Sequence, residues 1–153
     1  LPGKVIVVTG ATKGIGRGIA LALAGEGARV VVGGRNQEQG AAVVAEIREK
    51  HRVESLFVRS DISRVDDCRR LIDEGADRFG RIDGLVNNAG IFPRALIENT
   101  EEKMFDEVFG VNVKGALFCA KHLIRHLLAE KRGGSIVNIG SSHVYSGLDE
   151  LMV

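Results

Sequence analysis

The stretch that decides the fold is KVIVVTGATKGIG, residues 4–16. It opens with four β-branched residues, Val5 to Val8, and such an unbroken apolar run is typical of a parallel strand buried on both faces. Glycines follow at positions 10, 14 and 16, and the residues from Gly14 to Ala24 then repeat apolar side chains at helical spacing. The stretch therefore predicts a strand, a glycine-rich turn and a helix in direct succession.

The same alternation of strand and helix continues along the chain. Apolar runs at residues 29–32, 55–58, 84–87 and 134–139 predict four more strands. Helical patterns separate them, and we expect Asn36 and Ser63 to cap helices that reach residues 51 and 79. Asn99 or Thr100 is expected to open one long helix that reaches about residue 129. Five strands and four helices predict an α/β fold, a doubly wound parallel sheet of the Rossmann type, in one domain over residues 1–153.

Composition narrows the possible functions. The chain has 21 basic and 20 acidic residues, so it lacks the positive charge expected of a nucleic-acid-binding protein. No apolar run approaches the length of about 18 residues that a membrane span needs, and no signal peptide opens the sequence. Two cysteines are too few for a disulfide scaffold. These features predict a soluble, intracellular, cytoplasmic protein.

The glycine-rich turn predicts a phosphate-binding site. In a doubly wound sheet, ligands bind beyond the carboxyl ends of the strands. Gly10 allows a sharp turn there, Gly14 lets a ligand approach the backbone, and Gly16 lets the helix pack on the sheet. The free amides at the start of the helix would face an anion, most naturally the pyrophosphate of a dinucleotide. The P-loop pattern does not occur, whereas a purely structural tight turn stays an alternative for this motif on its own.

The motif Thr-Gly-x-x-x-Gly-Ile-Gly at residues 9–16 resembles the cofactor loop of the short-chain dehydrogenase/reductase family. Four further motifs match the family in order: Asp61-Ile62, Asn87-Asn88-Ala89-Gly90, Asn112 in the long helix, and Ser141 after the fifth strand. The resemblance implies that cofactor-binding residues lie in the glycine loop and at the strand ends. They are Gly10, Thr12, Lys13, Gly14, Ile15, Gly16, Asp61, Ile62, Asn88, Ala89 and Gly90.

The end of the second strand predicts which nicotinamide cofactor is bound. Sheets that bind NAD usually carry Asp or Glu there to hold the ribose 2′-hydroxyl. Here Gly34 holds the position at which NAD-dependent members of the family carry Asp, and Arg35 follows it. Arg35 and Lys13 suit a 2′-phosphate, so the sequence favours NADP(H) over NAD(H). The alternative is that both cations are solvated loop residues.

The resemblance also implies the reaction, which is hydride transfer between NADP(H) and a carbonyl or alcohol substrate. Ser141, with Ser142 as a neighbouring alternative, matches the serine that positions the substrate oxygen, and Asn112 matches the asparagine of the proton relay. In the family a tyrosine donates the proton, and a lysine four residues later lowers its pKa. Tyr145 is the only tyrosine of this chain, and Asp149 stands where that lysine is required.

Because the tyrosine and lysine are missing, we expect the domain to lack its C-terminal part and residues 1–153 to be inactive on their own. The alternative from another class is a truncated, non-catalytic nucleotide-binding or interaction module derived from the same fold. No metal site is expected, since Cys119, His122 and His126 share a helix face without a suitably placed carboxylate. By resemblance, the helix of residues 100–129 would pair subunits of a homo-oligomer.

Overall fold

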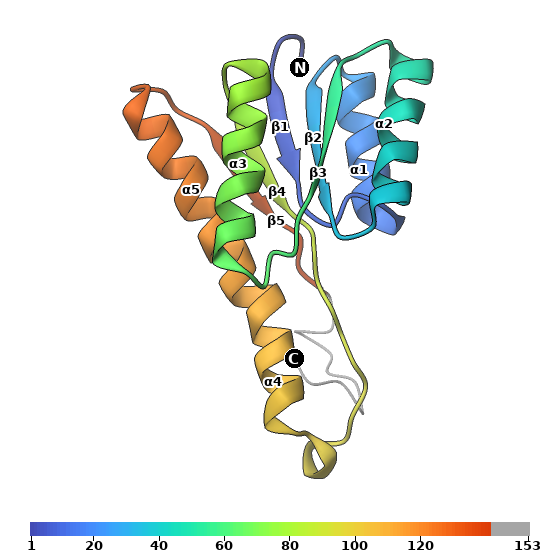
Figure 1. Cartoon of the computed structure of the whole chain (residues 1–153), viewed down its shortest axis with the longest axis vertical. Helices are drawn as coiled ribbons and strands as arrows, with labels where there is room; N and C mark the ends of the chain where they lie inside the picture. The colour runs from blue at the N-terminus through green and yellow to red at the C-terminus, as the bar shows by residue number, and fades with distance from the viewer. Residues whose placement is uncertain (142–153) are drawn as a thin grey trace.

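The computed structural model describes residues 1–141. Within that range, a five-stranded parallel sheet has the strand order β3-β2-β1-β4-β5. The strands are β1 (Val5–Val8), β2 (Arg29–Gly34), β3 (Ser55–Arg59), β4 (Gly84–Asn87) and β5 (Ser135–Asn138). The chain starts in the middle of the sheet, winds outward to β3, and returns past β1 to β4 and β5 (Figure 1). The doubly wound parallel sheet predicted from the sequence is confirmed.

Helices cover both faces of this sheet (Figure 1). The elements α1 (Gly14–Gly25) and α2 (Gln37–His51) pack on one face, and α3 (Val65–Phe79) and α5 (Ala116–Ala129) pack on the other. In β2, Val31 belongs to the core under α3 and α5, while Val30 and Val32 belong to the core under α1 and α2. This period of two follows from the pleat of a strand, and it explains why an unbroken apolar run can be buried on both sides.

The long helix predicted for residues 100–129 begins later and is less regular than expected. A 3-10 turn, η1 (Ile97–Asn99), precedes α4 (Glu102–Phe109), so neither Asn99 nor Thr100 opens the helix. Between α4 and α5 lies η2 (Gly110–Gly115), a π-helical segment. The three segments α4, η2 and α5 form one rod that extends well beyond the edge of the sheet (Figure 1).

The prediction that Ser63 caps a helix is wrong. The first residue of α3 follows Arg64, and no side chain caps this helix. Ser63 instead donates its N–H and its hydroxyl to Asp61 Oδ1, at 3.1 and 2.8 Å. A carboxylate two residues earlier in the chain is the stronger partner and forms a local turn. The equivalent prediction for Asn36 is confirmed, because its side chain accepts the N–H of Gln39 at 2.9 Å.

A buried carboxylate holds the amino-terminal edge of the sheet. Asp83 is 8% exposed and accepts the N–H of Val5 at 3.0 Å, Arg81 Nε at 2.9 Å and an Arg132 guanidinium nitrogen at 3.2 Å. Burial alone would raise the pKa of Asp83, but the hydrogen bonds from Arg81 and Val5 outweigh it and lower the pKa below its ordinary value. This carboxylate therefore joins β1, β4 and the turn before β5 at the end opposite the glycine loop.

Among the helices of residues 1–141, none is long and apolar enough to cross a membrane.

Candidate active site

The carboxyl ends of the strands bring most of the predicted site residues to one edge of the sheet. Strand order reverses between β1 and β4, and sheets of this kind bind ligands beyond the carboxyl ends of the strands at such a point. The glycine loop follows β1, Asn88 to Gly90 follow β4, and Arg35 follows β2 directly. Asp61 and Ser141 come after β3 and β5 at the same edge.

The glycine loop leaves an open helix N-terminus at this edge. Gly10 and Gly14 have φ angles of 63° and 54°, in the left-handed region that favours glycine. A Cβ at Gly16 would lie 2.4 Å from the carbonyl oxygen of Gly10, so only glycine lets α1 approach the loop this closely. No side chain caps α1, whose N-cap residue is Lys13, and a Cβ at Gly14 would meet nothing within 4 Å. Uncapped amides beside open space fit a bound phosphate group.

Thr9 joins the glycine loop to the loop after β4. Its buried hydroxyl accepts the backbone N–H groups of Asn88 and Ala89, each at 3.0 Å, and donates to the Val86 carbonyl at 3.4 Å. The side-chain amide of Asn88 in turn donates to the carbonyl oxygens of Thr9 and Gly10, at 3.0 and 3.2 Å. These bonds fix Asn88 and Ala89 against the glycine loop.

Sequence reasoning missed Thr9 as a site residue. The signal was present, because Thr9 is a polar residue that directly continues a fully apolar strand and directly precedes the first glycine of the loop. Such a residue, buried at a strand end, must find hydrogen-bond partners, and here strand β4 and the loop after it supply them.

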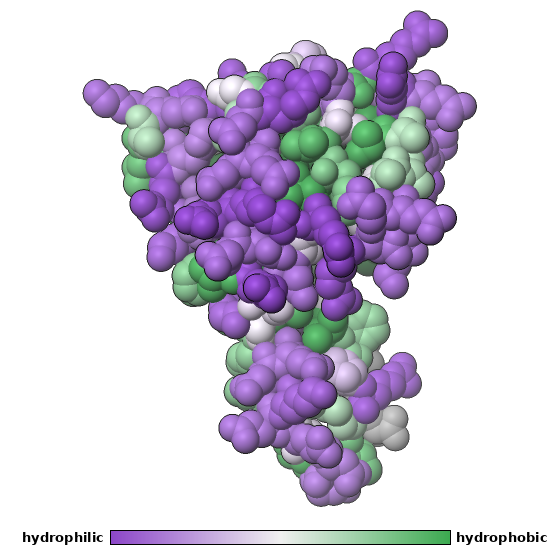
Figure 2. All heavy atoms as spheres, viewed as in Figure 1, coloured by the Kyte–Doolittle hydropathy of each residue, from purple (hydrophilic) through white to green (hydrophobic). Residues whose placement is uncertain are grey.

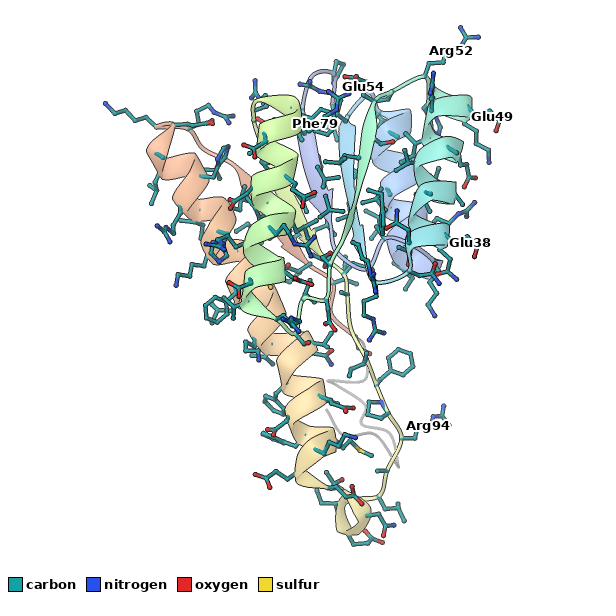
Figure 3. The ribbon with its side chains drawn as sticks, in the orientation of Figure 1. Glu38, Glu49, Arg52, Glu54, Phe79 and Arg94 are labelled. Carbon is teal, nitrogen blue, oxygen red and sulfur yellow. The ribbon has the colours of Figure 1, made fainter. Side chains whose placement is uncertain are left out.

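The rim at the end of β2 carries two exposed cations, Arg35 and Lys13. Ile15 is 70% exposed on the same side of the glycine loop. The last residue of β2, Gly34, is buried and bears no carboxylate. Glu38 lies in the first turn of α2 and projects away from the sheet (Figure 3). The β2 rim is therefore suited to an anionic group.

Asp61 and Ile62 lie at the end of β3, but their side chains are engaged in different ways. Asp61 is half-buried, accepts both donors of Ser63, and donates its own N–H to Asp67 Oδ2 at 2.8 Å. Ile62 is 7% exposed and packs in the core under α3 and α5. A contact between Ile62 and a cofactor would therefore involve its backbone rather than its side chain.

Asn112 lies in the π-helical segment η2 and holds the chain that follows β4. Its Oδ1 accepts the N–H of Ile91 and its Nδ2 donates to the Ile91 carbonyl, both at 2.9 Å. A π-helical turn changes the direction in which a side chain points, and such turns are common at functional sites. Here it turns Asn112 toward Ile91, so this asparagine positions the loop at Gly90.

Ser141 leaves the sheet beside the same loop. The register pairs Asn87 of β4 with Asn138 of β5, and the side chain of Asn87 donates to that of Asn138 at 2.9 Å. The N–H of Ile139 continues the ladder to the Asn87 carbonyl at 2.9 Å. Ser141 comes three residues after Asn138, as Gly90 comes three residues after Asn87. These two predicted site residues therefore follow neighbouring, paired strands at the same edge of the sheet.

Other predicted features take no part in this site. Residues 1–141 contain no group of three or more His, Cys, Asp or Glu side chains that could hold a metal ion. Cys119 is fully buried in the core, and burial lowers the pKa of His122 on the same helix. Ser142 and Tyr145 lie outside the described residues.

Two surface hollows flank α2, and the smaller one adjoins the site. A hollow of about 320 Å³ lies between the glycine loop and α2, with Thr12, Lys13 and Gly14 in its wall. A hollow of about 650 Å³ runs along the outer side of α2 against Phe57 of β3. Figure 2 shows hydrophobic atoms gathered at this second place, between α3 and α2. Its lining includes no residue of the glycine loop or of the loops after β4 and β5, so it is separate from the site.

Known proteins are similar to this chain in sequence and in architecture. Residues 4–152 match the family model of the short chain dehydrogenases. An uncharacterized oxidoreductase of Methylorubrum extorquens is 42% identical over 156 residues, which cover 96% of this chain and 62% of that protein. The 3beta-hydroxysteroid dehydrogenase of Mediterraneibacter gnavus is 40% identical over 139 residues, which cover 90% of this chain and 49% of that protein.

Solved structures agree with these sequence matches. A Sinorhizobium meliloti protein described as a short-chain alcohol dehydrogenase has a TM-score of 0.93 at 36% identity, covering 98% of this chain and 59% of that one. An alcohol dehydrogenase of the archaeon Thermococcus sibiricus, complexed with 5-hydroxy-NADP, has a TM-score of 0.89 at 28% identity, covering 96% of this chain and 62% of that one. The chain thus spans about half to three-fifths of the length of these relatives. With the glycine loop, the Asn-Asn-Ala-Gly loop and the sheet order in place, the chain belongs to the short-chain dehydrogenase family of oxidoreductases.

Proposed function

We propose that the protein transfers hydride between NADP(H) and a carbonyl or alcohol substrate. The observation that carries this proposal is the end of β2, where Gly34 offers no carboxylate and Arg35 and Lys13 are exposed. A carboxylate there would bind a ribose 2′-hydroxyl and repel a 2′-phosphate, whereas a guanidinium and an ammonium attract that phosphate. The 5-hydroxy-NADP bound by the Thermococcus sibiricus relative supports a cofactor of this class.

In this proposal the dinucleotide lies along the carboxyl edge of the sheet. The uncapped N-terminus of α1 receives the pyrophosphate, and Asp61 contributes near the adenine. The residues that would hold the cofactor are Gly10, Thr12, Lys13, Gly14, Ile15, Gly16, Arg35, Asp61, Ile62, Asn88, Ala89 and Gly90. When bound, the nicotinamide supplies or accepts the hydride.

The catalytic part of the proposal assigns Ser141 to the substrate oxygen and Asn112 to the proton relay. In support, Ser141 follows β5, which pairs with β4, and Asn112 is bonded to Ile91 in the segment that follows β4. Proton donation near neutral pH needs an acid whose pKa is lowered by an adjacent cation, and Tyr145 is followed by Asp149 rather than by a lysine. We therefore propose that residues 1–153 bind the cofactor but do not turn over substrate on their own.

The substitution Arg35→Asp tests the cofactor. Loss of a charge-assisted bond to phosphate should raise the Kd for NADPH by about 10- to 100-fold and leave the Kd for NADH within a few-fold. Fluorescence titration of both cofactors measures the two constants. Arg52→Asp is the matched control, because Arg52 is exposed at the far end of α2 (Figure 3) in a left-handed conformation that Asp tolerates. An unchanged preference in Arg35→Asp would contradict the NADP(H) assignment.

Turnover separates an enzyme from a binding module. NADPH oxidation is followed with a panel of ketones, using residues 1–153 and, in parallel, a form extended at the C-terminus. We expect both forms to bind NADPH and only an extended form with a Tyr-x-x-x-Lys pair to consume it. Consumption of NADPH by residues 1–153 alone would show that the tyrosine and lysine are dispensable.

We also propose that the rod of α4, η2 and α5 pairs subunits in a homo-oligomer. Six large apolar side chains on this rod are exposed, in steps of four or seven residues that keep them on one side. They are Phe105, Phe109, Val113, Leu117, Ile124 and Leu128. A continuous exposed apolar stripe of this kind is typical of a protein–protein interface.

A further inference from the structure

We infer that Thr12 determines cofactor choice by occupying the space that a side chain at position 34 would need. This inference rests on the proposed use of NADP(H). A Cβ placed on Gly34 would lie 2.5 Å from Thr12 Cγ2, 3.4 Å from its Oγ1 and 3.5 Å from its Cβ. The first of these distances is shorter than real Cβ atoms allow, while the other two are tolerable. The methyl group of Thr12 is therefore the atom that must move before position 34 can carry a residue larger than glycine.

The backbone on both sides of this contact is hydrogen-bonded, so a shift of either segment would strain those bonds. The N–H of Ala11 donates to the Gly33 carbonyl at 2.9 Å, which ties the glycine loop to the end of β2. The N–H of Ser60 donates to the Gly34 carbonyl at 2.9 Å, which ties β2 to the end of β3. Gly34 is buried and Thr12 is half-buried between these bonds.

Rotation of the Thr12 side chain offers little relief. A β-branched residue carries two heavy atoms on Cβ, so two of its three staggered rotamers keep a methyl or hydroxyl group in any given direction. Only the rotamer that turns the Cβ hydrogen toward Gly34 would make room. Removal of the branch atoms has the same effect without a rotamer change, because Thr12 Cβ is already at an ordinary contact distance.

The contact has a chemical consequence because of where it lies. Position 34 ends β2, the place from which an acidic side chain accepts the 2′-hydroxyl of an NAD ribose. With Thr12 in its present rotamer an acid at position 34 clashes with its methyl group, and the anionic group of the cofactor meets Arg35 and Lys13 instead. Thr12 and Gly34 therefore act as one unit in specificity, although they are 22 positions apart in the sequence.

A stability cycle in the whole protein tests the steric part without any cofactor. We expect Gly34→Ala to lower Tm by about 3–8 °C when Thr12 is present. In a Thr12→Ala background the same substitution should lower Tm by less than about 2 °C, because the offending methyl is gone. Thr12→Val is the matched control, because valine keeps both branch atoms. In this background Gly34→Ala should lower Tm as much as it does when Thr12 is present. A cost that is the same in all three backgrounds would overturn the inference.

Cofactor titration tests the chemical part. Gly34→Asp alone should weaken both NADPH and NADH, since the carboxylate repels the phosphate while its clash with Thr12 distorts the loop. Adding Thr12→Ala should strengthen NADH binding by at least about tenfold over Gly34→Asp alone, and adding Thr12→Val should not. Equal NADH binding by Gly34→Asp with and without Thr12→Ala would overturn the inference.

The two arms keep this inference distinct from the proposed function. If the unmodified protein bound NADH as tightly as NADPH, the proposed NADP(H) preference would be wrong. The Tm cycle would still decide whether Thr12 excludes a side chain at position 34, because it needs no cofactor.

Discussion

At the scale of single residues, one hydroxyl group joins the glycine loop to the loop after β4, both of which belong to the proposed cofactor site. Thr9 is fully buried, and its Oγ1 is the acceptor for two backbone N–H groups that belong to no strand. A backbone donor that is buried without an acceptor costs about 1–3 kcal/mol. The position of Asn88 and Ala89 therefore depends on an atom 79 and 80 residues away in the chain.

The substitution Thr9→Val tests this dependence while keeping the shape of the side chain. We expect the free energy of unfolding to fall by about 2–4 kcal/mol, because two N–H groups lose their acceptor. NADPH binding should weaken too, since the loop after β4 is released. Urea denaturation and fluorescence titration measure the two effects. Thr9→Ser keeps the hydroxyl and is expected to lose less than half as much stability; equal losses in both variants would argue against the hydrogen bonds as the cause.

At the scale of elements, the position of α5 depends on a close approach to the chain that follows β3. Gly115 ends η2, and a Cβ there would lie 2.7 Å from the carbonyl oxygen of Ile62. Gly18, in the middle of α1, is exposed, and a Cβ there would meet nothing within 4 Å. Both glycines thus lie in helical segments, but only Gly115 is tightly packed.

Alanine at these two glycines should therefore change stability in opposite directions. Gly115→Ala is expected to lower the free energy of unfolding by about 1–3 kcal/mol, because α5 must move away from a backbone oxygen. Gly18→Ala is expected to raise it by about 0.5–1 kcal/mol, the usual gain from replacing glycine in a helix. Denaturant unfolding of both variants decides. A gain in unfolding free energy in both variants would show that α5 has room to shift.

The elements also show which parts of the fold could be predicted from the sequence. Local sequence patterns predict the strands and most of the helices. Asn36 caps α2 as predicted, because this cap involves only neighbouring residues. Ser63 fails as a cap because Asp61 competes for it. The π-helical segment η2 had no local signal, since it accompanies a contact between Asn112 and Ile91 that only the tertiary fold creates.

The site follows the same division. The strand-end motifs could be located because parallel strands place their carboxyl ends at one edge. The hydrogen bond between Thr9 and Asn88 and the contact between Thr12 and Gly34 could not be predicted. Both depend on strand register and on differences of a few tenths of an ångström in interatomic distance.

At the scale of the whole molecule, the amino-terminal edge of the sheet responds to acid. The pKa of Asp83 is lowered in the folded protein, so its bonds add stability at pH values above the unfolded pKa, about 3.9, and lose it as the pH falls through the lower folded value. We expect Asp83→Asn to cost about 2 kcal/mol at pH 7, after allowance for the partial exposure of Arg81.

The cost of Asp83→Asn should shrink as the pH falls below about 4, because the unfolded protein then binds a proton at Asp83 while the folded protein does not, and it should be smallest once the pH is below the lower folded pKa. Urea denaturation at pH 7 and pH 3 measures the change. Asp77→Asn, an exposed carboxylate on α3, is the control and should have little effect at either pH. If the loss of unfolding free energy in Asp83→Asn did not depend on pH, packing rather than charge would be its cause.

Assembly is the second property of the whole molecule that can be measured. Leu117 is 63% exposed near the centre of the apolar stripe on the rod. Leu117→Glu should shift the protein to a smaller species in analytical ultracentrifugation, because a buried unpaired charge at an interface is costly. Val65→Glu changes an exposed apolar residue of α3, outside the stripe, and should leave the sedimentation unchanged. A monomer before any substitution would refute the proposed homo-oligomer.

The contact between Thr12 and Gly34 also constrains the order in which mutations can accumulate. A lineage that acquired an acid at position 34 first would pass through a less stable protein that binds neither nicotinamide cofactor well. Loss of the Thr12 methyl first leaves β2 intact and removes the obstacle, so the acid can follow without that penalty. For this protein, a change of cofactor preference would then have a preferred first step, at position 12.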